Sequence, residues 1–148
     1  MAYEVLSADG VVFSVWGETL VEDVAAVLEH VRAVVRECGH PIVYITRVPL
    51  DAPAPDAKVR SYINTIMPEL TDLCSSYHVI LEGGGLASAI KRGVLMGLFQ
   101  VRRRRNMFHV HAEASEVAEQ VALDRRDAVC ALLKQADARG ILHGPLPT

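Results

Sequence analysis

The chain has 148 residues, of which 51% are hydrophobic and 22% charged, and its net charge is −3. This balance is typical of one globular domain, and the mild negative charge excludes a bulk attraction to nucleic acid. The three cysteines include no Cys-x-x-Cys pair, which argues against a disulfide framework and a cysteine-based zinc site. The first ten residues do not match a signal peptide and the apolar stretches are too short for a membrane helix. We therefore expect a cytoplasmic protein with no membrane insertion.

The start of the chain predicts two strands and then a helix. The strands are Tyr3–Leu6 and Val11–Trp16, and Asp9-Gly10 between them is a hairpin signal because both positions tolerate positive φ. Thr19 and Glu22 match the capping-box pattern of a helix start, and apolar residues three and four apart follow them.

The remainder of the chain alternates strand and helix patterns. The predicted elements are a strand at Ile42–Thr46, a helix capped by Asp56, a strand at Tyr77–Glu82, a helix at Leu86–Arg103, a strand at Met107–His111, and a helix from Ser115 to about Arg139. Pro68 lies inside the second of these helices and predicts a kink.

Such alternation implies crossover connections and hence parallel strands. The sequence predicts the α/β fold class, with one domain over residues 1–140 and a loosely ordered tail at residues 141–148. We expect a mixed, mostly parallel sheet of about five strands with four main helices, in the order β-β-α-β-α-β-α-β-α.

Polar residues and glycines follow the ends of the two central strands, where open α/β sheets place their sites. Glycines before a helix let an anion approach the backbone, but no Gly-x-Gly-x-x-Gly or P-loop pattern is present. The three glycines are equally explained as a tight turn between strand and helix. The candidate partner or ligand surface consists of Arg47, Asp51, Asp56, Glu82, Gly83, Gly84 and Gly85.

Two histidines, His109 and His111, lie on one face of a predicted edge strand, and His78 on another strand is a third candidate for a metal site. No carboxylate or cysteine is spaced to complete such a site. We favour exposed histidines on the outer face, with Phe108 and Val110 toward the core, and expect no metal or cofactor. No signature of a nucleophile with its base is present, so we expect no catalytic residue.

The predicted helix at Leu86–Arg103 has two features that suggest contacts. It ends in the basic run Arg102–Arg105, which suits a solvated helix C-terminus and alternatively could bind nucleic acid or anionic lipid in a salt-sensitive way. Both of its sides are apolar, so it must be covered twice. Either the last helix covers it, or Leu95, Met96 and Phe99 form the surface of a homodimer.

Several segments resemble the STAS-like family, named after sulfate transporters and anti-sigma-factor antagonists. The segments are VVFSVWGETLVEDV, PIVYITRVPLDAPAPDAKVRSYI, YHVILEGGGLASAIKRG and NMFHVHAEASEVAEQVA, within roughly residues 3–125. The resemblance implies a small regulatory or scaffolding module that binds a protein partner. In the antagonist branch a Ser or Thr before the second helix is phosphorylated, whereas the loop Val48–Asp56 here contains no hydroxyl residue.

The resulting expectation is a non-enzymatic regulatory or scaffolding module that binds a protein partner. The first alternative is an enzyme or a binder of a small anionic metabolite or nucleotide, at the strand ends near Glu82–Gly85. The second alternative is a binder of nucleic acid or lipid through Arg102–Arg105.

Overall fold

A single five-stranded sheet forms the centre of the molecule. The computed structural model describes residues 3–49, 51–53, 55–82 and 107–147. The strands follow one another across the sheet in chain order, and β1 is antiparallel to β2 while every other pair is parallel. This confirms the predicted α/β class and mixed, mostly parallel sheet. The strands are β1 (Tyr3–Ala8), β2 (Val11–Trp16), β3 (Ile42–Val48), β4 (Cys74–Leu81) and β5 (Phe108–His111).

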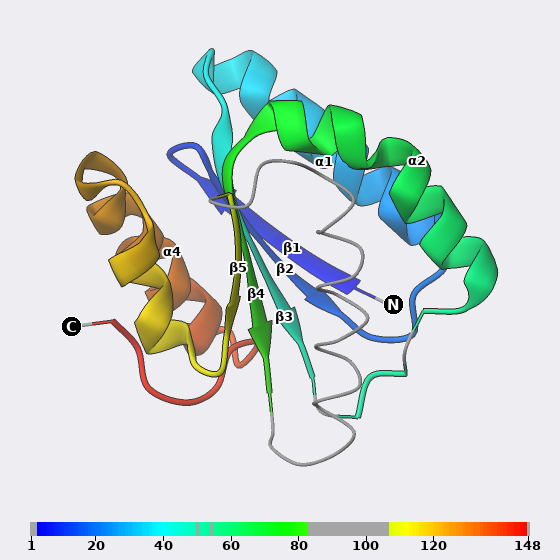
Figure 1. Ribbon diagram of the computed structural model, residues 1–148. Helices are drawn as coiled ribbons and strands as arrows, with labels where there is room; N and C mark the ends of the chain where they lie inside the picture. Colours follow the sequence, from blue (N-terminus) through cyan, green and yellow to red (C-terminus); the bar gives the residue numbers. More distant parts are fainter. Residues whose placement is uncertain (1–2, 50, 54, 83–106, 148) are drawn as a thin grey trace.

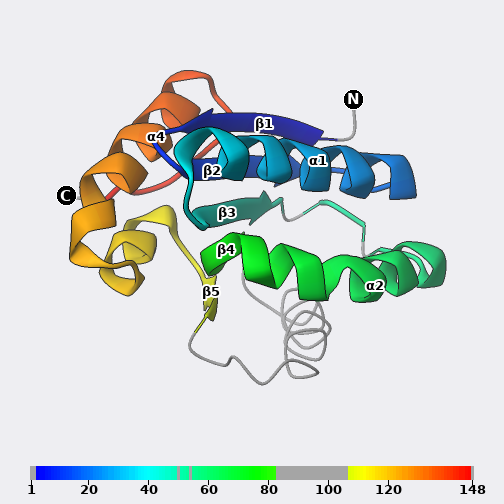
Figure 2. The ribbon, with the colours of Figure 1, turned by 90° about the horizontal axis from the view of Figure 1, so that it is seen from above.

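Helices lie on both sides of this sheet (Figures 1 and 2). On one side are α1 (Val21–Cys38) and α2 (Ala57–Leu73), and on the other is α4 (Arg126–Ala138). Each parallel strand is added beside the previous one, so right-handed crossovers place α1 and α2 on the same side. The opposite side receives the C-terminal part of the chain. No described helix is long and apolar enough to cross a membrane.

Several predicted features lie outside the described residues. They are the helix at Leu86–Arg103, the glycines Gly83, Gly84 and Gly85, the apolar residues Leu95, Met96 and Phe99, and the basic run Arg102–Arg105.

The predicted helix from Ser115 to about Arg139 is wrong as one element. The chain forms two 3₁₀ segments, η1 (Ala114–Gln120) and η2 (Leu123–Arg125), before α4 begins. Ser115 does not cap η1, since its hydroxyl donates to Glu113 instead. Buried residues of η1 and of α4 belong to one core on the same side of the sheet, and η1 contacts β5 whereas α4 contacts β1 and β2. The chain therefore turns between them, and this packing overrides a continuous helical pattern.

Of the predicted starts of the first two helices, one is wrong by one residue and the other is confirmed. The capping box is wrong by one residue: α1 begins after Leu20, whose N–H donates to Asp23 Oδ2 at 2.9 Å. The Thr19 hydroxyl donates to the carbonyl of Gly17. Asp56 caps α2 as predicted, because its Oδ1 accepts the N–H of Val59 at 2.9 Å.

Two hydrophobic clusters hold the layers together. Between the sheet and the pair α1 and α2, buried residues include Val31, Tyr44 and Leu70. Between the sheet and the C-terminal part of the chain, they include Phe13 and Leu132. The tail also joins the second cluster, and its Leu142 is buried.

Candidate functional site

The carboxyl ends of β3 and β4 bring two of the predicted site residues together. Arg47 is opposite Ile80 in the strand register, so Glu82 lies one side chain further along the same face of β4. The guanidinium binds the carboxylate at two points: Nε pairs with Oε1, and Nη2 donates to Oε2 at 3.0 Å. Arg47 Nη1 also donates to the carbonyl of Ile141 in the tail, at 3.3 Å. The two groups thus join both strand ends to the tail.

This ion pair is shielded from water. The side chains of Arg47 and Glu82 are 10% and 26% exposed. A two-point contact between guanidinium and carboxylate is strong and geometrically specific. The guanidinium of Arg47 and the carboxylate of Glu82 therefore bind mostly each other and offer little to an external ligand.

The loop that follows β3 presents the other two described site residues outward. Asp51 and Asp56 are both exposed, while Ala52 between them is buried and its N–H donates to the carbonyl of Pro49 at 3.1 Å. Asp56 is engaged at the start of α2, as described above. Asp51 is thus an exposed carboxylate that follows Arg47 closely in the sequence.

The three strand histidines do lie together, but the prediction that His109 and His111 are exposed is wrong, since His111 is buried and His109 is partly buried. His78 and His111 are fully buried or nearly so, with 0% and 4% exposure. They lie on the face of the sheet that packs against the C-terminal part of the chain, because His78 is opposite Ile45 and His111 is opposite Ile80. The strand pattern places His109 and His111 on one face correctly, but which face is covered depends on residues after Glu113, far along the chain.

Two hydrogen bonds and one longer polar contact connect these side chains in a row. Ser76 Oγ lies 2.8 Å from His78 Nε2, His78 Nδ1 lies 3.0 Å from His111 Nε2, and His111 Nδ1 lies 3.8 Å from a carboxylate oxygen of Glu116 in η1. The ring of His109 stacks on that of His78 at a centroid distance of 4.9 Å. We call these five side chains the histidine cluster.

Burial keeps the imidazoles of His78 and His111 neutral. It lowers the pKa of His78 to about 3, with smaller contributions from His109 and His111. It likewise lowers the pKa of His111 to about 4, with a further contribution from His109. A base with a pKa this low takes up a proton poorly at neutral pH, which makes His78 a weak activator of the Ser76 hydroxyl.

The cluster has the wrong geometry for a metal. Ligand lone pairs lie in the ring planes and must converge on one point, whereas His78, His109 and His111 are nearly parallel, with interplanar angles of 13°, 19° and 20°. Among the described residues, no group of three or more His, Cys, Asp or Glu side chains is arranged so that it could hold a metal ion. Sequence reasoning missed the contact of Ser76 with His78, although their spacing of two on a strand is a usable signal.

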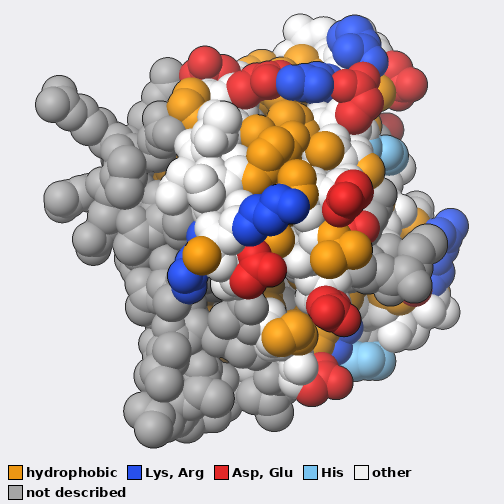
Figure 3. All heavy atoms as spheres, turned by 90° about the vertical axis from the view of Figure 1, so that its right-hand side faces the viewer, with side chains coloured by type: hydrophobic (Ala, Val, Ile, Leu, Met, Phe, Trp, Pro, Cys, Tyr) orange, Lys and Arg blue, Asp and Glu red, His pale blue; other side chains and the backbone are white. Residues whose placement is uncertain are grey.

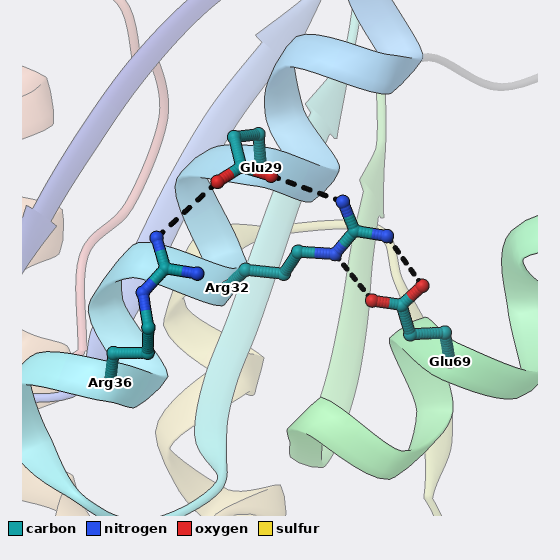
Figure 4. Close-up of polar contacts among 4 residues, drawn as sticks. All are labelled: Glu29, Arg32, Arg36 and Glu69. Carbon is teal, nitrogen blue, oxygen red and sulfur yellow. Dashed lines mark hydrogen bonds and ion pairs between the residues drawn. The ribbon is translucent and has the colours of Figure 1, made fainter.

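A second ionic network joins α1 to α2 at the surface (Figure 4). Arg32 binds Glu69 of α2 at two points and also Glu29 of its own helix, which in turn pairs with Arg36. Hydrogen bonds from the arginines lower the pKa of the Glu29 and Glu69 carboxyls. Figure 3 shows the surface on the right of Figure 1, where acidic and basic side chains border a hydrophobic area. These charges are mixed in sign, so they create no one-sided field.

A third polar group is buried beneath α1 and α2. The Ser14 hydroxyl lies 2.7 Å from the Tyr44 hydroxyl and donates to Thr46 Oγ1 at 3.0 Å. Burial raises the pKa of Tyr44 to about 12, so this phenol stays neutral. Mutual satisfaction of buried hydroxyls stabilises the packing of β2 against β3.

We compared the chain with protein families, curated proteins and solved structures. No family model matches the chain, and neither the curated proteins nor the solved structures gave a match.

Proposed function

We propose that this protein is a non-enzymatic regulatory or scaffolding module of the STAS-like type, which acts by binding a protein partner. The proposal rests on one observation: the candidate reactive side chains that the structure describes pair with one another or are buried. Arg47 is bound to Glu82, and His78 and His111 are buried and neutral. Groups arranged in this way stabilise a fold more readily than they act on a substrate.

The element order supports the resemblance on which the proposal rests. A hairpin, then parallel strands joined through helices, is the pattern that suggested the STAS-like family. The loop between β3 and α2 supplies the surface. It exposes Asp51 and Asp56, and neither carboxylate requires phosphorylation to be negative.

The chemistry of this loop defines the partner that it fits. Two exposed carboxylates favour a surface that carries Lys or Arg, and such an interface weakens as salt increases. The Arg47–Glu82 pair beneath fixes the strand ends from which the loop departs.

Capture from a lysate of the source organism, with the purified protein as bait, tests this proposal. We expect Asp51→Arg to lose the captured partner, while Glu37→Arg retains it. Glu37 is a suitable control because it is exposed near the end of α1, at the opposite end of β3. Equal capture by both variants, or no specific protein captured by the wild type, would contradict the proposal.

Thermal-shift screening against metabolites tests the enzyme or ligand alternative. A ligand that binds only the native state raises the melting temperature. A saturable rise with a nucleotide or another small anion would favour that alternative over a protein partner. The alternative that involves Arg102–Arg105 predicts salt-sensitive binding to nucleic acid or anionic vesicles, which neutralisation of these arginines abolishes.

A further inference from the structure

We propose that the histidine cluster is a proton-sensitive latch, which holds β5 and η1 against β4 while His78 and His111 are neutral and releases them when these two rings take up protons. The latch is made by side chains of three elements: Ser76 and His78 from β4, His109 and His111 from β5, and Glu116 from η1.

The contacts of the latch favour one tautomer for each ring. The Glu116 carboxylate can only accept, so a proton on the ring nitrogen that faces it at 3.8 Å, His111 Nδ1, is favoured over a lone pair there. His111 Nε2 is then an acceptor, and His78 Nδ1–H donates to it. His78 Nε2 in turn accepts from the Ser76 hydroxyl. Every donor in this row has an acceptor, and no net charge is placed on either ring.

Protonation of both rings disrupts this arrangement. If His78 and His111 each carried both protons, two N–H groups would face each other across 3.0 Å. Two positive rings would also lie at a centroid distance of 5.3 Å, with a third imidazole, His109, stacked beside His78. Like charges at such distances in a shielded site repel strongly.

The charges on the described residues around the latch offset this repulsion only weakly. Glu116 faces His111, but its side chain is 47% exposed and therefore screened by water. Further along the same face of β4, Glu82 is bound to Arg47. The charged residues of α4 are on an element that packs against β1 and β2, at the other end of the sheet.

Because of the position of the latch, its opening is expected to affect β5 and η1 first. β5 has four residues and pairs with β4 alone among the described strands, and η1 contacts it directly. A short edge strand depends on the side chains that fasten it, so protonation is expected to release β5 and η1 before the rest of the sheet unfolds.

The sign and size of the pH effect follow from linkage. Both histidines have pKa values below the 6.5 of a free imidazole, so the open state binds more protons and the closed state is favoured above that pH. As pH falls below 6.5, the ratio of closed to open molecules decreases about tenfold per pH unit for each ring. At pH 5 the loss is about 30-fold per ring, and it continues to grow until pH reaches the closed-state pKa of about 4 or about 3.

Hydrogen exchange of the β5 amides between pH 7 and pH 5, corrected for the intrinsic pH dependence of exchange, tests the proposal. We expect protection of the wild type to decrease much more than protection of His111→Gln. This variant keeps an acceptor for His78, but its side chain cannot be protonated. With one titrating ring fewer, the loss of protection at pH 5 should be about 30-fold smaller. His143→Gln, at an exposed position in the tail, should behave as wild type. Parallel pH profiles for wild type and His111→Gln would overturn the latch.

A second measurement applies if His111→Gln does not fold. NMR titration of the wild-type imidazoles should show His78 and His111 neutral down to about pH 5, and β5 amide signals broadening or shifting as they protonate. Titration of both rings near 6.5, with β5 unchanged, would overturn the proposal.

Discussion

Substitution of Glu82 by Gln tests whether the Arg47–Glu82 pair fixes the strand ends. The change keeps the size of the side chain but leaves the guanidinium of Arg47, 10% exposed, without its negative partner. Breaking a buried pair in this way typically costs about 3–5 kcal/mol, and we expect about 2–3 kcal/mol here because the Glu82 side chain is partly exposed. In urea denaturation followed by circular dichroism, this lowers the midpoint by about 1–2 M.

The surface pair Arg32–Glu69 provides the matched control. It has the same two-point geometry and also joins separate elements, but its side chains are 38% and 45% exposed. We expect Glu69→Gln to change the urea midpoint little, because water and salt screen exposed charges. Equal effects of the two Glu→Gln substitutions would refute the reasoning that burial sets the value of the pair. The double variant Arg47→Met with Glu82→Gln should recover part of the loss, because no unpaired charge remains.

Three further predictions concern the core, a turn and a thiol. Leu132→Ala should lower the free energy of unfolding by about 2–5 kcal/mol in urea, since Leu132 is fully buried; a loss below about 1 kcal/mol would contradict the packing of α4. Gly10→Ala should lower the melting temperature more than Gly140→Ala: both have positive φ, but at Gly10 the new Cβ would lie 2.6 Å from Arg125 Nη2 and displace it from the carbonyl of Asp9, to which it donates. Equal losses would contradict that contact. Burial raises the pKa of the Cys74 thiol to about 12, so iodoacetamide at pH 8 should alkylate it only as the protein unfolds, as mass spectrometry can show; rapid alkylation of the folded protein would contradict its burial.

Local patterns predicted the sheet well because strands and tight turns leave local signals. The run Ile42–Thr46 is β-branched and aromatic, and the strand indeed occupies Ile42–Val48. The hairpin at Asp9 and Gly10 follows from their tolerance of positive φ, and the structure gives them φ values of 52° and 75°.

The larger errors arose where distant parts of the chain meet. The break between η1 and α4 depends on how each packs on a different part of the sheet, which spacing along one segment does not encode. The burial of His78 and His111 depends on the same packing. The pairing of Arg47 with Glu82 required the register of β3 against β4, although both residues were already assigned to one strand-end surface.

The most direct test of the proposed function is hydrogen exchange of the protein alone and with its captured partner. The account predicts that the partner slows exchange in residues 51–53 and 55–60, around the exposed Asp51, and that it leaves the end of α1 at Glu37 and Cys38 unchanged. Slower exchange at the end of α1, with the loop before α2 unaffected, would contradict it.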